Sequence, residues 1–186
     1  WLAEDRQVAT QPGGWLIDVP EMNTVKSFPV IGCDLSYGEY HGNIYVNWAD
    51  QRNGALDTDI WLVRSEDGGS AWSKPIRVND DPKTLGGKQQ FMNWMTVDPV
   101  TGFIYIVFYD RRGHEGPETD VYMAYSSDGG RSFVNEKISA SSFTPNPDVF
   151  LGDYIGISAN AGMVRPVWTR LDGDMMAVMT ALIDSR

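Results

Sequence analysis

Carboxylate, guanidinium and phenol groups occur in this sequence where strand-like segments end or begin. Asp110 follows an apolar run, and Asp153 and Tyr154 lie within another expected strand, at 150–157. Two carboxylates about 5–9.5 Å apart can hydrolyse a glycosidic bond, and a carboxylate beside a tyrosine can activate its phenol as a nucleophile. We therefore predict Asp153, Tyr154 and Asp110 as candidate catalytic residues, with Glu115 as an alternative second carboxylate.

Further polar residues are expected on the same face of the fold. In a fold whose consecutive strands run up and down, the loops after second strands and before first strands share one end. The predicted ligand-binding residues at that end are Asp50, Arg52, Gln90, Asn93, Arg111, Arg112 and Arg170.

One pairing in this set occurs twice at equivalent places, as Asp50 with Arg52 and as Asp110 with Arg112. Two interpretations are open. Each pair forms an ion pair that holds its own loop, or each pair contacts a ligand.

The segments that must position these groups form a tandem repeat. Strands are expected at 28–34, 43–50, 59–64 and 75–79, again at 91–97, 103–109, 120–125 and 136–139, and in a degenerate copy at 150–157, 163–168 and 175–181. Trp72 and Phe133 lie 61 residues apart at matching positions. No segment has a sustained 3.6-residue period, which excludes a helical solenoid. Repeated four-stranded antiparallel units predict an all-β fold, a β-propeller.

The repeat gives the expected boundaries. Residues 1–27 are a lead-in with one lone strand at 15–19, followed by blades at 28–88 and 89–147 and a degenerate blade at 148–186. Propellers have about 4–8 blades, so we expect this arc to be completed by a second chain or by an N-terminal half that is absent here. The sequence opens on Trp1 with no signal peptide, which fits such a loss.

Two short stretches between third and fourth strands follow the pattern Ser-x-Asp-x-Gly-x-x-aromatic. Their residues are Ser65, Asp67, Gly69 and Trp72, and then Ser126, Asp128, Gly130 and Phe133. The aspartate can accept N–H groups of the turn that follows, and the glycines adopt positive φ at little cost. We predict that both stretches are structural turns.

Composition excludes several functions. Lys+Arg 15 against Asp+Glu 25 gives a net charge of −10, which disfavours nucleic-acid or anionic-membrane binding. No apolar run approaches the roughly 20 residues of a membrane span, and Cys33 is the single cysteine. No cofactor is expected. The segments 57–59 and 79–81 could bind a structural Ca²⁺, although a solvated loop is the favoured interpretation.

The two Ser-x-Asp-x-Gly turns resemble the Asp-box, or bacterial neuraminidase repeat, of the sialidase superfamily. The segments 28–30, 45–52, 108–112 and 150–154 are similar to the C-terminal half of secreted bacterial sialidase-like proteins that are known as predicted glycosyl hydrolases. The resemblance covers roughly residues 15–184. It implies a sialidase-like propeller with a ligand site at the mouth of its central channel.

The resemblance also implies an activity and a location. Sialidases use an arginine triad, a tyrosine nucleophile paired with a glutamate, and an acid/base aspartate, and they carry an Arg-Ile-Pro motif that this sequence lacks. Two functions are therefore open: a carbohydrate-active enzyme, or a non-catalytic propeller that binds a glycan or a protein. Either is expected to be secreted or at the cell surface, with the periplasm as an alternative.

Overall fold

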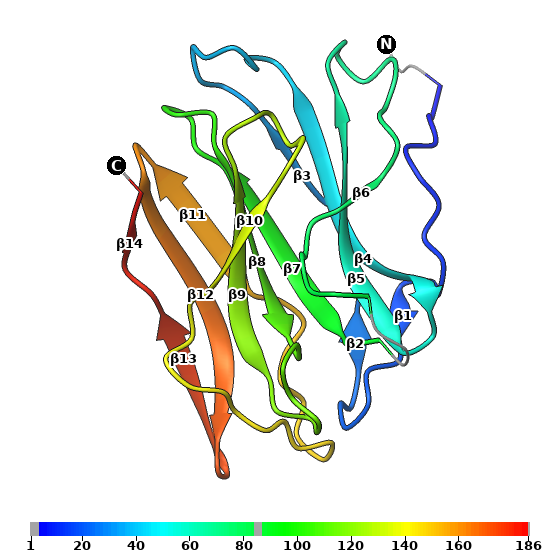
Figure 1. Ribbon diagram of the computed structural model, residues 1–186, viewed down its shortest axis with the longest axis vertical. Helices are drawn as coiled ribbons and strands as arrows, with labels where there is room; N and C mark the ends of the chain where they lie inside the picture. The colour runs from blue at the N-terminus through cyan, green and yellow to red at the C-terminus, as the bar shows by residue number, and fades with distance from the viewer. Residues whose placement is uncertain (1–3, 84–86, 186) are drawn as a thin grey trace.

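The computed structural model describes residues 4–83 and 87–185, and all its regular elements are strands (Figure 1). Residues 1–3, 84–86 and 186, which include Trp1 and part of the segment leading into the second expected blade, lie outside the described residues. The strands form one two-stranded sheet and three larger antiparallel sheets. The predicted all-β propeller architecture is confirmed, and the described sheets form part of a propeller.

The first two large sheets have the same order of four strands. Sheet one contains β3 (Val30–Cys33), β4 (Ile44–Gly54), β5 (Asp57–Ser65) and β6 (Ile76–Arg77), and sheet two contains β7 (Gln90–Val97), β8 (Ile104–Asp110), β9 (Asp120–Ser126) and β10 (Val134–Lys137). Each strand pairs with the next in the chain. This meander is the product of the period-2 pattern and the glycine-rich turns of the repeat.

The third sheet contains three neighbouring strands, β11 (Gly156–Asn160), β12 (Met163–Asp172) and β13 (Met175–Thr180). β11 begins several residues later than expected, so Asp153 and Tyr154 precede it instead of entering it. A short β14 (Ile183–Asp184) pairs with the beginning of β12, with Ile183 opposite Val164 and Asp184 opposite Met163. It lies on the same side of β12 as β13. β14 therefore continues β13 past Pro166, which has no N–H to donate.

The lead-in strand is not alone, which corrects one expectation. β1 (Leu16–Ile17) pairs with β2 (Val25–Lys26) in a short antiparallel hairpin. Ile17 and Val25 are both buried in the main core. The strand β2 could not be predicted from the sequence, because the alternation of apolar and polar residues around 25–28 is too short to indicate a strand.

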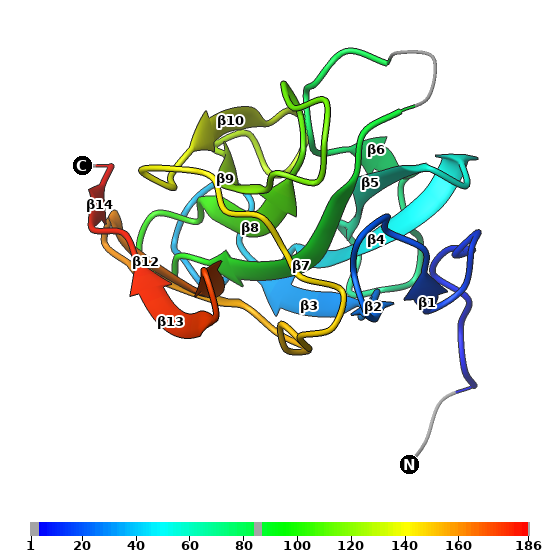
Figure 2. The same ribbon diagram turned by 90° about the horizontal axis from the view of Figure 1, so that it is seen from below.

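The three sheets are packed through their first strands. β7 contacts both β3 and β11, and in the view along the strands β3 and β7 lie side by side while β6 and β10 lie toward the upper edge (Figure 2). Every residue of β8 is buried because the second sheet has neighbours on both faces. The first strands therefore line the inner side of the arc.

A buried aspartate joins the second sheet to the third. Asp98 accepts backbone N–H groups from Val100 and Thr101 of its own turn, and from Ala161 and Gly162 of the β11–β12 turn at 3.1 and 2.8 Å. Burial by itself raises the pKa of a carboxyl, but these four donors lower the pKa of Asp98 below its usual value. The carboxylate therefore holds the second and third blades together by accepting hydrogen bonds from both.

The two Ser-x-Asp-x-Gly turns have the same hydrogen bonds. Ser65 Oγ donates to Asp67 Oδ1 at 2.9 Å and accepts Gly69 N–H at 2.8 Å, and Ser126 repeats this with Asp128 and Gly130 at 2.8 and 2.9 Å. The turns also touch each other, since Arg131 of the second pairs with Glu66 of the first at 2.9 Å. These contacts fix the geometry of the two turns.

We predict that Gly129→Ala is more destabilising than Gly68→Ala. Both glycines follow the turn aspartate with positive φ, 68° and 73°, so each alanine costs about 1–2 kcal/mol of backbone strain. A Cβ on Gly129 would also lie 2.6 Å from the Tyr40 ring, whereas Gly68 faces open space. Urea unfolding is expected to show a further loss of about 1–3 kcal/mol at position 129. Equal losses at both positions would contradict this packing.

Asp128 also gives a prediction about pH. Its burial is outweighed by hydrogen bonds from Ser132, Ser126 and Arg131, which lower its pKa to about 2. The folded state therefore binds this proton less tightly than the unfolded state, and the carboxylate stabilises the fold above its ordinary pKa. We expect Asp128→Asn to lower stability at pH 7, and the difference from wild type to shrink as the pH falls toward 2. A difference that stays constant between pH 7 and pH 2 would contradict this role.

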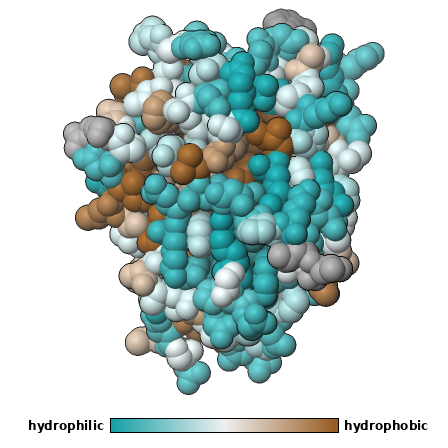
Figure 3. All heavy atoms as spheres, viewed as in Figure 1, coloured by the Kyte–Doolittle hydropathy of each residue, from teal (hydrophilic) through white to brown (hydrophobic). Residues whose placement is uncertain are grey.

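The outer face of the third sheet is uncovered. Its exposed apolar side chains include Val178 and Leu182, each 79% exposed, and Met175, 72% exposed. Figure 3 shows apolar side chains along the left edge, the side on which β12 and β13 lie in Figure 1. The equivalent strands of the second sheet are buried, so this face has the character of a surface between blades.

Candidate functional site

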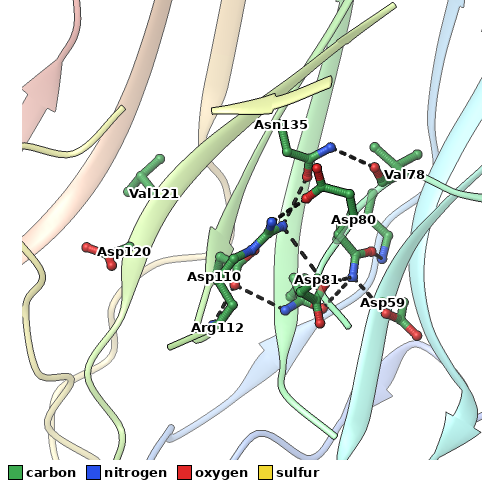
Figure 4. A network of polar contacts seen from close by, with 12 residues as sticks. Asp59, Val78, Asp80, Asp81, Asp110, Arg112, Asp120, Val121 and Asn135 are labelled. Carbon is green, nitrogen blue, oxygen red and sulfur yellow. Dashed lines mark hydrogen bonds and ion pairs between the residues drawn. The ribbon is translucent and has the colours of Figure 1, made fainter. Parts of the chain in front are cut away.

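Most of the predicted aspartates and arginines lie in networks between or within blades. Arg112 Nε lies 2.7 Å from Asp110 Oδ2, and its guanidinium reaches Asp80 and Asn135 of neighbouring segments (Figure 4). The same group stacks on the Tyr122 ring at 4.2 Å. Arg112 thus joins the second blade to the loop that ends the first.

The first blade has an equivalent Asp–Arg pair stacked on an aromatic ring. Among the described residues, the hydrogen bonds, ion pair and ring contacts of this arginine do not reach a neighbouring large sheet. Arg52 Nη2 lies 2.5 Å from Asp50 Oδ2, and the guanidinium stacks on the Trp61 ring at 4.3 Å. The guanidinium also lies 5.6 Å from the centre of the Trp48 ring and donates to the Thr10 carbonyl at 3.2 Å. Both Asp–Arg pairs therefore have the geometry of the loop-holding interpretation, and neither aspartate has exposed side-chain area.

The loops that were considered for Ca²⁺ form a buried polar cluster, which corrects the expectation of a solvated loop. Asn79 donates to Asp59, Asp81 and Gln90, each at 2.7 Å, and Arg77 pairs with Asp59 and with Asp81 at 2.9 Å. Gln90 in turn donates to Asp110 at 3.1 Å. Among the described residues, no three acidic, histidine or cysteine side chains converge as a group of metal ligands.

Asp110 lies in this network and away from Asp153. It is fully buried, and desolvation raises its pKa to about 6 against the opposing charge of Arg112. Both its oxygens already accept hydrogen bonds, from Gln90 and Arg112, and it does not line the cavity that Asp153 lines. The expected pairing of Asp110 with Asp153 across a substrate is therefore not formed.

Arg170 is also held by an ion pair within its own strand end and by a neighbouring loop. Its Nε lies 2.6 Å from Asp172 Oδ1, and its Nη1 donates to Ser141 Oγ at 2.7 Å. This is a third loop-holding pair, in the reverse sequence order of the other two. Arg111 is placed differently, with its guanidinium buried beside the Phe91 ring.

Four aromatic side chains gather where the first strands begin, and we call them the aromatic platform: Trp15, Phe28, Trp94 and Tyr154. Phe28 stacks on Tyr154 with ring centroids 5.5 Å apart, and contacts Trp15 at 6.1 Å. Trp94 meets Tyr154 edge-on at 6.0 Å. Trp15 and Tyr154 are 53% and 61% exposed. Each ring comes from a different part of the chain, so the three blades and the β1–β2 hairpin build the platform together.

Polar groups border the platform. Lys26 Nζ lies 2.7 Å from Asp153 Oδ1 and 5.9 Å from the Trp15 ring. Asn93 donates to Asn47 Oδ1 at 2.7 Å, while its own Oδ1 is buried with no hydrogen-bond partner among the described residues. A buried acceptor without a donor is costly, so Asn93 Oδ1 is suited to a hydroxyl group supplied by a ligand.

A narrow cavity of about 10 Å³ joins these groups. Its lining brings together the predicted residues Asn93, Asp153 and Tyr154 with Lys26 and Trp94. That volume holds one oxygen atom with its hydrogens, about the size of a water molecule. A group larger than a single hydroxyl or water therefore does not fit into this slot.

The backbone beside the slot is irregular. The register of β7 with β8 shifts between Phe91 and Trp94, and Met92 has a φ of 51°. Positive φ is costly for a residue with a side chain and often occurs at functional positions. The bulge turns Asn93 and Trp94 toward the slot, which a regular strand would not do.

The sequence pattern did not identify Trp15, Lys26, Phe28 and Trp94 as site residues, because strand alternation favoured a core position for most aromatic residues. Asp153 has Lys26 as its partner, and no described hydrogen bond joins it to the Tyr154 hydroxyl. The sequence signal for the platform was an aromatic residue shortly before β3 and β11, Phe28 and Tyr154, and one within β7, Trp94.

Comparison with known proteins bears on the fold. No family model and no curated protein matches the chain. Among solved structures, an α-L-arabinanase of Penicillium chrysogenum in complex with arabinobiose matches with a TM-score of 0.58 and 13% identity over 96% of this chain and 53% of its own. A protein of unknown function from Dyadobacter fermentans gives 0.53 and 19% over 80% and 36%, and a Hadza microbial sialidase gives 0.52 and 15% over 84% and 45%.

These matches define a class. At such low identity they establish the fold alone, a β-propeller architecture that this chain shares with the arabinanase and the sialidase. The chain spans about half of these proteins' length or less. The described part of the chain contains no helix long and apolar enough to cross a membrane.

Proposed function

We propose that this chain is the ligand-binding part of a secreted, sialidase-like carbohydrate-active propeller, and that it holds a glycan on the aromatic platform. The observation that supports this most is the platform itself, with exposed rings beside a slot that contains an unpartnered acceptor. Sugar rings have apolar faces that pack on aromatic rings, and hydroxyl edges that need polar partners.

The polar rim of the platform fits hydroxyl recognition. One hydroxyl enters the slot and donates to Asn93 Oδ1, while Asp153 and Lys26 offer an acceptor and a donor to its neighbours. Asp153 and Lys26 neutralise each other, so the platform itself carries no net charge. Neutral or weakly acidic glycans are therefore the proposed ligands.

A non-catalytic role has its own support. Glycoside hydrolysis uses two carboxylates on either side of the bond, and Asp153 is the only carboxylate among the described residues that line the slot. Asp110 is buried elsewhere. The second candidate is therefore a binding module that holds a glycan at an extracellular or cell-surface assembly, and hydrolysis would require a carboxylate from outside these residues.

We also propose that another blade covers the outer face of the third sheet, supplied by a second chain or by a further part of the same protein. The exposed Val178 and Leu182 support this, since blades elsewhere bury the same strands. The propeller would then enclose the platform at the mouth of its channel.

Titration calorimetry and a hydrolysis assay with the same ligands test the proposal. The panel contains arabinobiose, galactobiose, cellobiose and sialyllactose. We expect saturable binding of at least one member, and loss of any turnover in Asp153→Asn if the protein is an enzyme. Saturable binding without turnover would favour the binding module, and no binding by any member would contradict the proposal.

A further inference from the structure

Arg111 is the most deeply buried arginine of the described chain, and it lacks a counter-ion. It is 2% exposed, whereas Arg52, Arg77 and Arg112 each have a carboxylate within 4 Å. Its Nη1 donates to the Pro20 carbonyl at 2.6 Å and its Nε to Thr119 Oγ1 at 3.2 Å. Its Nη2 is buried and has no partner among the described residues.

This side chain lines a cavity of about 290 Å³, close to the lower end of the usual range for ligand pockets, about 300–1,000 Å³. The cavity is formed by the loops around Pro20, Leu56, Gln89 and Pro117. It is distinct from the slot beneath the platform, since the two share no lining residue. An unpaired donor in the wall of an open cavity is a position that a ligand can satisfy.

The charges of the residues that line the cavity cancel. Arg111 and Lys88 contribute two positive charges, and Glu21 and Glu115 contribute two negative ones. Burial lowers the pKa of Arg111 to about 10, with Glu21 and then Glu118 opposing that shift. A free anion would meet two carboxylates here, which disfavours it. A hydroxyl group can accept a hydrogen bond from Arg111 and donate one to Glu115, so it matches both the cationic and the anionic side chains of the cavity.

We propose that this cavity is a second sugar subsite, which takes a neutral unit of the same glycan that lies on the aromatic platform. The inference rests on the proposed function and extends it from a single sugar to a chain of several units. Gln89 of the cavity and Met92 of the slot are three residues apart along the chain, which separates them by roughly 10 Å at most. One monosaccharide cannot occupy both sites, so an oligosaccharide must connect them.

The test compares glycans of different length with variants of the cavity. Calorimetry uses the disaccharide and the hexasaccharide of the arabino, galacto and cello series, with trigalacturonate as an acidic probe. Glu115→Gln is the main variant because its side chain is exposed, and the exposed Glu136→Gln in β10 is its matched control. Arg111→Gln is a second variant, accepted only where its melting temperature shows that it folds.

We expect the hexasaccharide to bind about tenfold more tightly than the disaccharide, a gain of about 1.4 kcal/mol. Glu115→Gln should remove most of this gain and leave disaccharide affinity unchanged, and Glu136→Gln should change neither. Disaccharide binding on the platform without a length-dependent gain would overturn this inference alone. So would a gain that Glu115→Gln leaves intact, or trigalacturonate binding more tightly than every neutral chain. No glycan binding at all would overturn the proposed function as well.

Discussion

Arg77→Ala is expected to lower the free energy of unfolding by about 3–5 kcal/mol, because it removes the ion-pair partner of buried Asp59 and leaves buried Asp81 with only Arg112, at 3.9 Å. Asp59 has no exposed side-chain area and Asp81 has 4%, and Arg77 pairs with both. Its Nη1 also donates to the Asp81 carbonyl at 2.5 Å. Since this cluster joins the first blade to the second through Gln90 and Asp110, the loss should reach the whole described structure.

Chemical denaturation followed by tryptophan fluorescence measures this effect. Arg64→Ala is the matched control, because Arg64 pairs with Glu66, which is 52% exposed, and should cost less than about 1 kcal/mol. Arg77→Lys restores the charge but not the forked donors, so it should recover only part of the loss. Equal effects of Arg77→Ala and Arg64→Ala would show that the buried cluster does not stabilise the fold.

Tyr154→Ala is expected to weaken glycan binding by about 30-fold or more, because it removes the most exposed ring of the aromatic platform. Truncating an aromatic anchor at the centre of a binding site costs on the order of 2 kcal/mol or more. Phe28 and Trp94 both pack on Tyr154, so their positions also depend on it. The loss should exceed what one missing contact would cause.

Tyr37→Ala is the matched control for this variant. Tyr37 is fully exposed and stacks on His41 in the loop after β3, outside the platform. Calorimetry with the tightest ligand of the panel should show unchanged affinity for Tyr37→Ala, and near-UV circular dichroism should show that both variants remain folded. If Tyr154→Ala binds as tightly as wild type, the platform is not the binding surface.

The architecture could be predicted from the sequence because the repeat supplied independent copies of the same pattern. Strands such as β4, β8 and β9 contain alternating or continuous apolar residues, and a turn with Asp-Gly follows the third strand, β5 or β9, of each of the first two blades. The third copy departs from the repeat pattern, so its strand boundaries are less certain from the sequence. The start of β11 was therefore predicted several residues too early. The partner of β1 was missed because two strands of two residues contain too little pattern to pair.

The candidate site could be predicted only in part. Asn93, Asp153 and Tyr154 were assigned to one end of the fold, and the structure brings all three to one slot. The aromatic platform could not be predicted, since its rings come from four separate segments and a bulge orients Trp94. Asp98 was missed for a similar reason, because two of its donors are in the next blade. The burial of Asp110 depends on packing between blades, which no local pattern encodes.

A nitrogen-15 NMR titration with the tightest-binding glycan tests the central claim most directly, because it locates the ligand. The account predicts saturable shifts in the indole N–H signals of Trp15 and Trp94 and in the backbone amides of Asn93 and Tyr154. It predicts little change at Trp72 in the turn at the opposite end of the blade. Saturable shifts confined to Trp72 and the two Ser-x-Asp-x-Gly turns, with the platform signals unmoved, would contradict it.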